Sequence, residues 1–391
     1  MRHLYLVVSF VFLLLVVSCV EQQRPEVTPW GTALGEDPVP PSTAFGLNDI
    51  INNGEIIMLT ISGPETYYDY HGKGMGLQYL LCEKFAQTLG VSLRVELCRD
   101  TAEMITRLKK GDADIVAFQL PKTVKGVCFA GAREDSNKTG WAVQLDNKEL
   151  ADALNKWFKP EMIAEINQRE RFLLSTRSVT RRVYSPMLNR TEGIISHYDK
   201  YFQQYAPIAR WDWRLMAAQC YQESTFDPQA RSWAGACGLM QIMPATATHL
   251  GLPHSSIYNP EDNIAAAAKY IKELNGLFGD VPASERVSFV LASYNGGHFH
   301  VRDAMALARK YGRNPHRWEH VKEFVLKLSS PTYYRDAVVK YGYMRGSETV
   351  DYVEKIHERW AQYRGVARGG AGSFMSPSVP TRAKHGNRWQ I

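Results

Sequence analysis

The stretch QCYQESTFDPQARSWAGACGLMQIMPATA, residues 219–247, places a carboxylate, Glu223, at the end of a largely apolar segment, followed by a loop rich in glycine and small residues. The apolar positions predict a helix over 213–224, with Asp212 near its N-cap. One side of this helix would carry Met216, Gln219, Cys220 and Glu223. Burial raises the pKa of a carboxyl group, as a general acid working near neutral pH requires. A lone terminal glutamate is more often exposed or ion-paired, so the rest of the chain must supply the other parts of a site.

The composition is that of a globular protein with room for two cores. The chain has 391 residues, of which 45% are hydrophobic and 22% charged, and its net charge is +6. The positive charge is concentrated near the end, where no acidic residue follows position 364. The folded part is therefore nearly neutral, and no nucleic-acid partner is predicted. Residues 366–391, rich in Gly, Ser and Pro, are predicted to be a basic disordered tail.

The first residues have the pattern of a secretory signal. Arg2 precedes an apolar run over 4–17, which is short for a membrane-spanning helix. The run ends in VVSC and resembles a bacterial lipoprotein signal, which implies that 1–18 is removed and that Cys19 is lipidated. An ordinary secretory signal with an incidental cysteine is the alternative. Residues 19–45, which contain several prolines, are predicted to form an extended tether.

The cysteines give no metal-binding pattern. Secretion implies an oxidising compartment, where disulfides are possible. A disulfide between Cys220 and Cys237 and two buried free thiols both fit the sequence. No metal and no cofactor are predicted, because no zinc motif matches the spacing of the five cysteines other than Cys19: Cys82, Cys98, Cys128, Cys220 and Cys237.

Residues 46–160 are predicted to form a small α/β domain. Strand-like runs alternate with helical runs in the order βαβαβ, which predicts a parallel sheet. Thr101 is the expected N-cap of the second helix. The strands are expected over 55–62, 91–97 and 113–118, and the helices over 74–90 and 101–111.

The pattern GMGLQYLLCEKFAQTLGVSLRV followed by LKKGDADIVAF resembles the first lobe of the periplasmic solute-binding proteins for amino acids. In that family a second lobe follows before the chain returns to the first. Here residues 140–158 resemble the segment that returns to the first lobe. Only residues 121–140 precede them, so the second lobe is missing. The family's ligand arginine is also absent. The domain is therefore expected to be a truncated structural or regulatory appendage, with a sensor for a muropeptide or amino acid as the alternative.

After a charged connector over 161–190, helical patterns dominate up to about residue 365. The predicted fold class is therefore α+β multidomain, with a small α/β domain followed by an all-α domain over 191–365. Four motifs occur there in a fixed order: ES at 223, GLMQIMP at 238, SYNGG at 293 and ETVDYV at 348. This ordered set resembles the lytic transglycosylases whose catalytic domain has a goose-lysozyme-like fold. With the lipid anchor and the solute-binding-like domain, the chain resembles the membrane-bound lytic murein transglycosylases.

The resemblance implies a role for each matching residue. Glu223 corresponds to the acid/base, and Ser224 to a neighbour that positions the substrate or the carboxyl group. The other implied substrate-binding residues are Gly238, Met240, Gln241, Tyr294, Asn295 and Tyr352. Each has a structural alternative: a methionine can be core, and an asparagine before two glycines can be a helix C-cap.

The implied reaction cleaves the bond between N-acetylmuramic acid and N-acetylglucosamine and closes a 1,6-anhydro ring. Ordinary glycosidases use two carboxylates, whereas the motifs here supply one; Asp227, in FDP, fits a turn better. The alternatives are a goose-type lysozyme on the same fold and a silent wall-binding scaffold. The implied partners are peptidoglycan glycan strands and a membrane. The chain is expected to be a monomer, anchored on the periplasmic face of a bacterial membrane, the outer one because Val20 is not aspartate.

Overall fold

The computed structural model describes residues 26–27, 33–34, 46–133 and 138–366. The predicted signal peptide, Cys19 and almost all of the predicted tail lie outside the described residues. The chain divides into two compact units, Met1–Thr43 and Ala44–Ile391. In the first unit, β1 (Glu26–Val27) pairs antiparallel with β2 (Ala33–Leu34), within the segment predicted as a tether.

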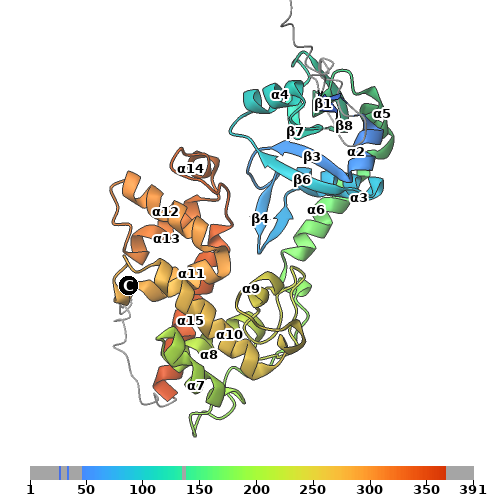
Figure 1. Ribbon diagram of the computed structural model, residues 1–391. Helices are drawn as coiled ribbons and strands as arrows, with labels where there is room; N and C mark the ends of the chain where they lie inside the picture. Colours follow the sequence, from blue (N-terminus) through green and yellow to red (C-terminus); the bar gives the residue numbers. More distant parts are fainter. Residues whose placement is uncertain (1–25, 28–32, 35–45, 134–137, 367–391) are drawn as a thin grey trace, which may run out of the picture. The chain divides into compact units, whose positions relative to one another are not determined.

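A five-stranded sheet organises residues 46–160 in the order β6-β3-β7-β9-β8 (Figure 1). Strand β3 lies between β6 and β7 and is parallel to both, as the βαβαβ pattern predicts. The strands are β3 (Glu55–Thr60), β6 (Ser92–Leu97), β7 (Ile115–Pro121), β8 (Val127–Arg133) and β9 (Thr139–Gln144). The helices are α2 (Leu47–Asn53), α3 (Leu77–Leu89), α4 (Thr101–Lys110) and α5 (Lys148–Trp157), followed by α6 (Glu161–Leu173).

Two details of this domain differ from prediction. The sheet is mixed, because β9 runs antiparallel to both β7 and β8. Strand β8 occupies the interval where the second lobe is missing, so the short insertion turns back as one sheet strand. The N-cap of α4 is Asp100, not Thr101: the Asp100 carboxylate accepts the N–H of Glu103, and Thr101 is the first helical residue.

Alternating side chains along the strands build a core on each face of the sheet. Ile56 and Met58 of β3 pack against α3 and α5 on one face, whereas Leu59 joins Met104 and Leu108 of α4 on the other. This alternation follows from the period-2 geometry of a strand with both faces covered. Before α3, β4 (Tyr68–Tyr70) and β5 (Lys73–Met75) form an antiparallel hairpin whose turn contains His71 and Gly72.

After α6, the regular elements of the described chain are all helices, so the predicted class of an α/β domain followed by an all-α domain is confirmed. One buried cluster extends from Ile195 to Tyr363. The predicted limits of the domains, at 160, 190 and 365, stay predictions. The helices are α7 (Asp199–Ala209), α8 (Trp213–Ser224), α9 (Pro244–His249), α10 (Pro260–Leu277), α11 (Ala283–Gly296), α12 (His298–Lys310), α13 (Trp318–Lys327), α14 (Pro331–Tyr334) and α15 (Gly346–Val366).

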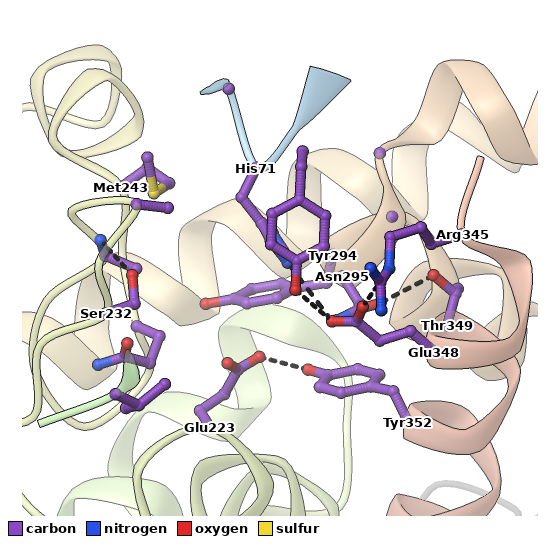
Figure 2. Close-up of a pocket in the computed structure, with 18 of the residues that line it drawn as sticks. His71, Glu223, Ser232, Met243, Tyr294, Asn295, Arg345, Glu348, Thr349 and Tyr352 are labelled. Carbon is purple, nitrogen blue, oxygen red and sulfur yellow. Dashed lines mark hydrogen bonds and ion pairs between the residues drawn. The ribbon is translucent and has the colours of Figure 1, made fainter. Parts of the chain in front are cut away.

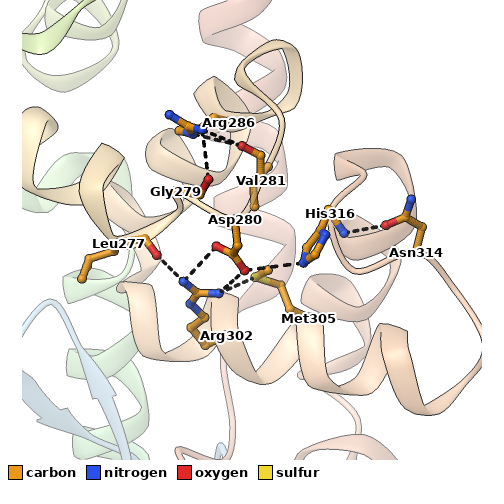
Figure 3. Close-up of polar contacts among 9 residues, drawn as sticks. All are labelled: Leu277, Gly279, Asp280, Val281, Arg286, Arg302, Met305, Asn314 and His316. Carbon is orange, nitrogen blue, oxygen red and sulfur yellow. Dashed lines mark hydrogen bonds and ion pairs between the residues drawn. The ribbon is translucent and has the colours of Figure 1, made fainter.

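A polar cluster fixes the turn between α10 and α11 (Figure 3). Arg286 donates to the carbonyl oxygens of Gly279 and Val281, and Arg302 of α12 pairs with Asp280 at 3.1 Å. His316 approaches the same carboxylate at 3.5 Å. These contacts satisfy carbonyl groups at a helix end and join α10, α11 and α12. No helix among the described residues combines the length and the apolar run that a bilayer crossing needs.

Candidate active site

A cleft of about 790 Å³ runs past the C-terminal end of α8. Its walls come from α8, the loop that follows α8, the end of α11 and the start of α15. The turn of the β4–β5 hairpin also lines it, so residues far apart in the sequence meet here. Figure 2 shows Glu223 on the floor of this cleft, with Tyr352 beside it and Tyr294 and His71 above.

Glu223 occupies the last turn of α8 because the helix is capped at both ends. The Asp212 carboxylate accepts the N–H of Arg214, as an N-cap does, and also pairs with its guanidinium at 2.6 Å. Thr225 and Phe226 then take left-handed backbone conformations with φ of 53° and 62°, which end the helix. The predicted helix over 213–224 and its N-cap are both found.

The environment of Glu223 favours the protonated carboxyl group. Burial raises its pKa, the hydrogen bond from Tyr352 and the charges of His71 and Arg181 oppose that rise, and the result is a pKa of about 7. The Tyr352 hydroxyl donates to Oε1 of Glu223 at 2.5 Å. Arg181 donates to the main-chain oxygen of Glu223 at 3.2 Å. A carboxyl group of this acidity holds its proton near neutral pH and can give it to a bound substrate.

The side of the cleft above Glu223 is held by hydrogen bonds between α11, α15 and the loop after α8. The Tyr294 hydroxyl donates to the carbonyl oxygen of Met240 at 2.7 Å. Asn295 accepts from the hydroxyl of Thr349 at 2.8 Å. Tyr294 and Asn295 therefore stand at fixed positions in the lining, as Figure 2 shows.

Glu348 is a second carboxylate in the lining, and both of its oxygens are engaged. Oε1 accepts from the Tyr70 hydroxyl at 2.7 Å, and Oε2 lies 3.3 Å from the Arg345 guanidinium. Although burial opposes ionisation, His71, Tyr70 and Arg345 hold the pKa of Glu348 below its usual value. Glu348 is thus an ionised group whose two oxygens are both bound to groups of the cleft wall.

The β4–β5 hairpin brings two aromatic side chains to the cleft. The ring of Tyr70 lies parallel to that of Trp233, with centroids 5.9 Å apart. His71 reaches within 3.9 Å of Glu348. The sequence did not predict Tyr70, His71 or Trp233 as cleft residues. Tyr70 and His71 lie in a short hairpin far from Glu223 along the chain, and Trp233, although close to Glu223, belongs to no motif that marks a cleft.

Four of the predicted substrate-binding residues line the cleft: Gln241, Tyr294, Asn295 and Tyr352. Ser224, Gly238 and Met240 are not among the lining residues. The Ser224 hydroxyl turns back to the carbonyl oxygen of Cys220 at 3.2 Å, and the Met240 side chain is fully buried in the core.

Gly238, which the resemblance implied as a substrate-binding residue, packs against other protein atoms instead. A Cβ atom there would come within 2.6 Å of the Asn263 side chain and 2.8 Å of the Ile257 carbonyl oxygen, and φ is +77°. Asn263, a fully buried residue of α10, clamps the loop by accepting from the N–H of Met240 at 2.8 Å and donating to the carbonyl oxygen of Cys237. Only glycine fits this contact without strain.

The remaining candidate groups have structural partners. Cys220 and Cys237 are both free thiols, as are the other cysteines of the described chain. The Asp227 carboxylate accepts the N–H groups of Arg182 and Gln229, which agrees with its predicted role in a turn. In the described ranges, no group of three or more His, Cys, Asp or Glu side chains could hold a metal ion.

Comparisons with known proteins agree with the geometry. Residues 200–316 match the family model of the Transglycosylase SLT domain. The chain is 32% identical over 298 residues to a membrane-bound lytic murein transglycosylase F of Desulfosudis oleivorans, an alignment that covers 69% of this chain and 61% of that protein. A protein of the same name from Aeromonas hydrophila is 27% identical over 430 residues, covering 84% of this chain and 85% of its own length.

Two of the similar solved structures each match less than half of the chain. The 70 kDa soluble lytic transglycosylase SLT70 of Escherichia coli shares 25% identity, with a TM-score of 0.29, over 43% of this chain and 24% of that chain. The arginine-bound form of domain 1 from TmArgBP shares 20% identity, with a TM-score of 0.26, over 30% of this chain and 97% of that chain. The family model and the curated relatives agree: residues 200–316 match the Transglycosylase SLT domain, and the chain spans 61% of the length of the relative from Desulfosudis oleivorans.

Proposed function

We propose that this protein is a peptidoglycan lytic transglycosylase that uses Glu223 as its single acid/base. The observation that carries the proposal is the contrast between the two glutamates that line the cleft, Glu223 and Glu348. The two aspartates of the lining have other partners, because Asp69 accepts the N–H of Gly72 and Asp351 pairs with Lys355. Glu223 has a pKa of about 7 and one donor on its carboxyl group, whereas Glu348 is ionised and engaged at both oxygens. One group fit for proton transfer suits a reaction in which the substrate supplies its own nucleophile.

The proposed reaction needs no water. Glu223 protonates the glycosidic oxygen between N-acetylmuramic acid and N-acetylglucosamine, and the C1–O bond breaks. The muramyl acetamido group stabilises the positive charge at C1. The Glu223 carboxylate then takes the proton of the muramyl C6 hydroxyl as that oxygen attacks C1. A 1,6-anhydro ring closes and the proton is back on Glu223, which is ready for another turnover.

The cleft residues have supporting roles in this proposal. Gln241, Tyr294, Asn295 and Tyr352 line the cleft and are proposed to contact the glycan strand. Ser224, Gly238 and Met240 are proposed to act indirectly, by holding the end of α8 and the loop in place. The parallel rings of Tyr70 and Trp233 offer apolar surface to the strand at the edge of the cleft.

Replacing Glu223 by Gln tests the proposal while keeping the shape of the side chain. A general acid typically contributes 10²–10⁴-fold to the rate, so Glu223→Gln should lower kcat by about a thousandfold or more, with substrate binding kept. Mass spectrometry of murein digested by the wild-type chain should show 1,6-anhydromuramyl ends. Reducing muramyl ends instead would identify a lysozyme, and unchanged murein would identify a silent scaffold.

We extend the proposal to the location of the protein in the cell and to its membrane and glycan partners. Relatives at this level of similarity are named membrane-bound, and the motif VVSC precedes a polar segment. Lipidation of Cys19 after cleavage would hold a monomeric enzyme on the periplasmic face of the outer membrane, next to the glycan strands. Cys19→Ala should abolish incorporation of labelled fatty acid and release the protein from the membrane fraction. Retention of label in that variant would refute the anchor.

A further inference from the structure

Gln219 lies one helical turn before Glu223 on α8 and is fully buried. Its side-chain Nε2 donates to the hydroxyl oxygen of Tyr352 at 3.1 Å, and that hydroxyl in turn donates to Oε1 of Glu223 at 2.5 Å. Gln219 is not among the residues that line the cleft. It can therefore affect the reaction only through Tyr352.

The chain of hydrogen bonds has one direction. A phenol hydroxyl has a single proton, and the lone pair of the Tyr352 oxygen on the Gln219 side is occupied by the amide N–H. The Tyr352 proton must then point at Glu223. The reverse orientation of the amide would put its oxygen against Tyr352, so that two acceptors would compete for one proton. In the observed orientation Oε1 of Gln219 is buried and has no hydrogen-bond partner. The reverse orientation would put the NH₂ group there, so that both of its N–H donors would lack an acceptor, which costs free energy.

A direction imposed on Tyr352 decides where Glu223 keeps its own proton. Toward Glu223, the Tyr352 hydroxyl acts only as a donor. The carboxyl oxygen that faces it, Oε1, must therefore accept, and it is the carbonyl oxygen of the acid form. The acid proton is left to Oε2. Figure 2 shows that this oxygen points away from Tyr352, toward the open part of the cleft. Among the described residues, none forms a side-chain hydrogen bond with Oε2 of Glu223.

On this geometry, and resting on the proposed role of Glu223 as the acid, we propose that Gln219 is a positioning residue that acts through Tyr352 to fix the acid proton of Glu223 on Oε2, facing the substrate. Without Gln219 the Tyr352 hydroxyl can rotate and accept a proton from Oε1. That form of the acid points its proton at a tyrosine instead of a glycosidic oxygen. It is unproductive.

The same contacts predict a change in acidity. The bond from Gln219 lowers the pKa of Tyr352, although burial and the nearby Glu223 dominate and raise it well above its usual value. A more acidic hydroxyl is a stronger donor to the Glu223 carboxylate. Losing Gln219 should therefore weaken the stabilisation of the ionised form and add a new bond to the protonated form, and both changes raise the pKa of Glu223.

Gln219→Met tests the inference in the full chain, with short uncrosslinked murein glycan strands as substrate. We expect kcat to fall by about tenfold, with KM unchanged because residue 219 does not reach the cleft. The alkaline limb of the pH–rate profile should move up by about half a pH unit or more. An unchanged kcat and an unchanged profile would overturn the inference.

A double-mutant cycle separates positioning from simple damage. In a Tyr352→Phe background the hydroxyl is gone, so adding Gln219→Met should change neither kcat nor the profile further. An equal loss in both backgrounds would mean a purely structural role. Gln78→Met is the matched control, because Gln78 is also a buried glutamine, which accepts from Trp141 in the α/β domain. It reports the effect of losing a buried amide far from the cleft.

Gln219→Glu provides a second, isosteric test if the methionine variant folds poorly. A carboxylate at 219 accepts the Tyr352 proton and reverses the chain of bonds, so kcat near neutral pH should fall further than in Gln219→Met. Wild-type activity in Gln219→Glu would overturn the inference. Activity of Glu223→Gln is measured alongside: if that variant stays active, the acid assignment fails, whereas an inactive Glu223→Gln with unaffected Gln219 variants contradicts the positioning role alone.

Discussion

The burial of Glu223 has a cost in stability at neutral and alkaline pH. The cleft keeps its pKa at about 7, above the value of 4.5 that it has in an unfolded chain. Between these two values the folded protein binds a proton that the unfolded chain has lost. Stability contributed by this group is therefore present below about pH 4.5 and lost as the pH rises through 7. Partial access to the cleft reduces the effect.

Replacing Glu223 by Gln should accordingly stabilise the protein in a pH-dependent way. We expect the free energy of unfolding of Glu223→Gln to exceed that of the wild type by about 1–3 kcal/mol at pH 8 and by little at pH 4. Urea unfolding at the two pH values measures this difference. Glu358→Gln, on the exposed side of α15, is the control and should show no such gain. A gain in the free energy of unfolding of Glu223→Gln that is equal at both pH values would contradict the raised pKa of Glu223.

Among the elements, α15 positions three of the cleft residues. It carries Glu348, Thr349 and Tyr352 on its first two turns, and it packs closely against α13 at its start. A Cβ atom at Gly346 would lie 1.8 Å from the carbonyl oxygen of Val325, a main-chain atom that cannot move aside. The position of Tyr352 over Glu223 therefore depends on a glycine that does not touch the cleft.

Gly346→Ala should consequently damage both fold and activity. We expect a loss of about 2 kcal/mol or more in the free energy of unfolding, since overpacking costs 1–3 kcal/mol and a backbone atom is involved, together with a lower kcat. Gly365→Ala is a matched control in the same helix, because a Cβ atom there meets nothing within 4 Å. It should be neutral or slightly stabilising. Equal stability of the two variants, measured by thermal unfolding, would show that α15 can shift without cost.

At the scale of the whole molecule, the helices that carry Glu223, Tyr294 and Tyr352 belong to one core. The large buried cluster that holds α8, α11 and α15 extends from Ile195 to Tyr363 and contains no residue of the α/β domain, whose two cores lie on the faces of its own sheet. Contacts between the two sets of elements include the bond from Tyr70 to Glu348 and the edge contact of Tyr68 with Tyr343, whose ring centroids are 5.0 Å apart.

A fragment spanning residues 178–366 should therefore fold and keep lytic activity. It retains Arg181, which bonds to the main chain at Glu223, and the strand-like contact of Thr180 with Arg231. Circular dichroism should show a cooperative helical transition, and murein digestion should still yield anhydro ends. A change in KM without loss of kcat would reflect the missing Tyr70 and His71. An unfolded fragment would show that the α/β domain is needed for the fold itself.

The sequence correctly predicted the elements that depend on interactions between residues close together along the chain. The helix over 213–224 and its Asp212 cap follow from periodicity and a capping carboxylate, and both are found. The order β6-β3-β7 follows from the βαβαβ pattern. Strand β8 was missed because its pairing with β9 is antiparallel and depends on a partner further along the chain. The predicted N-cap Thr101 was one residue too late, since Asp100 also has a capping side chain and is the observed N-cap.

By itself the sequence determined the helix that carries Glu223 and the two-part architecture, because periodicity is encoded along the chain. The resemblance of its ordered motifs to a family implied seven substrate-binding residues, of which Gln241, Tyr294, Asn295 and Tyr352 line the cleft. Only the tertiary structure decided which atoms surround the carboxyl group. The bonds from Gln219 through Tyr352 to Glu223 join residues more than 120 positions apart. Burial and hydrogen-bond direction, which set a proton's position, arise only when distant elements pack together.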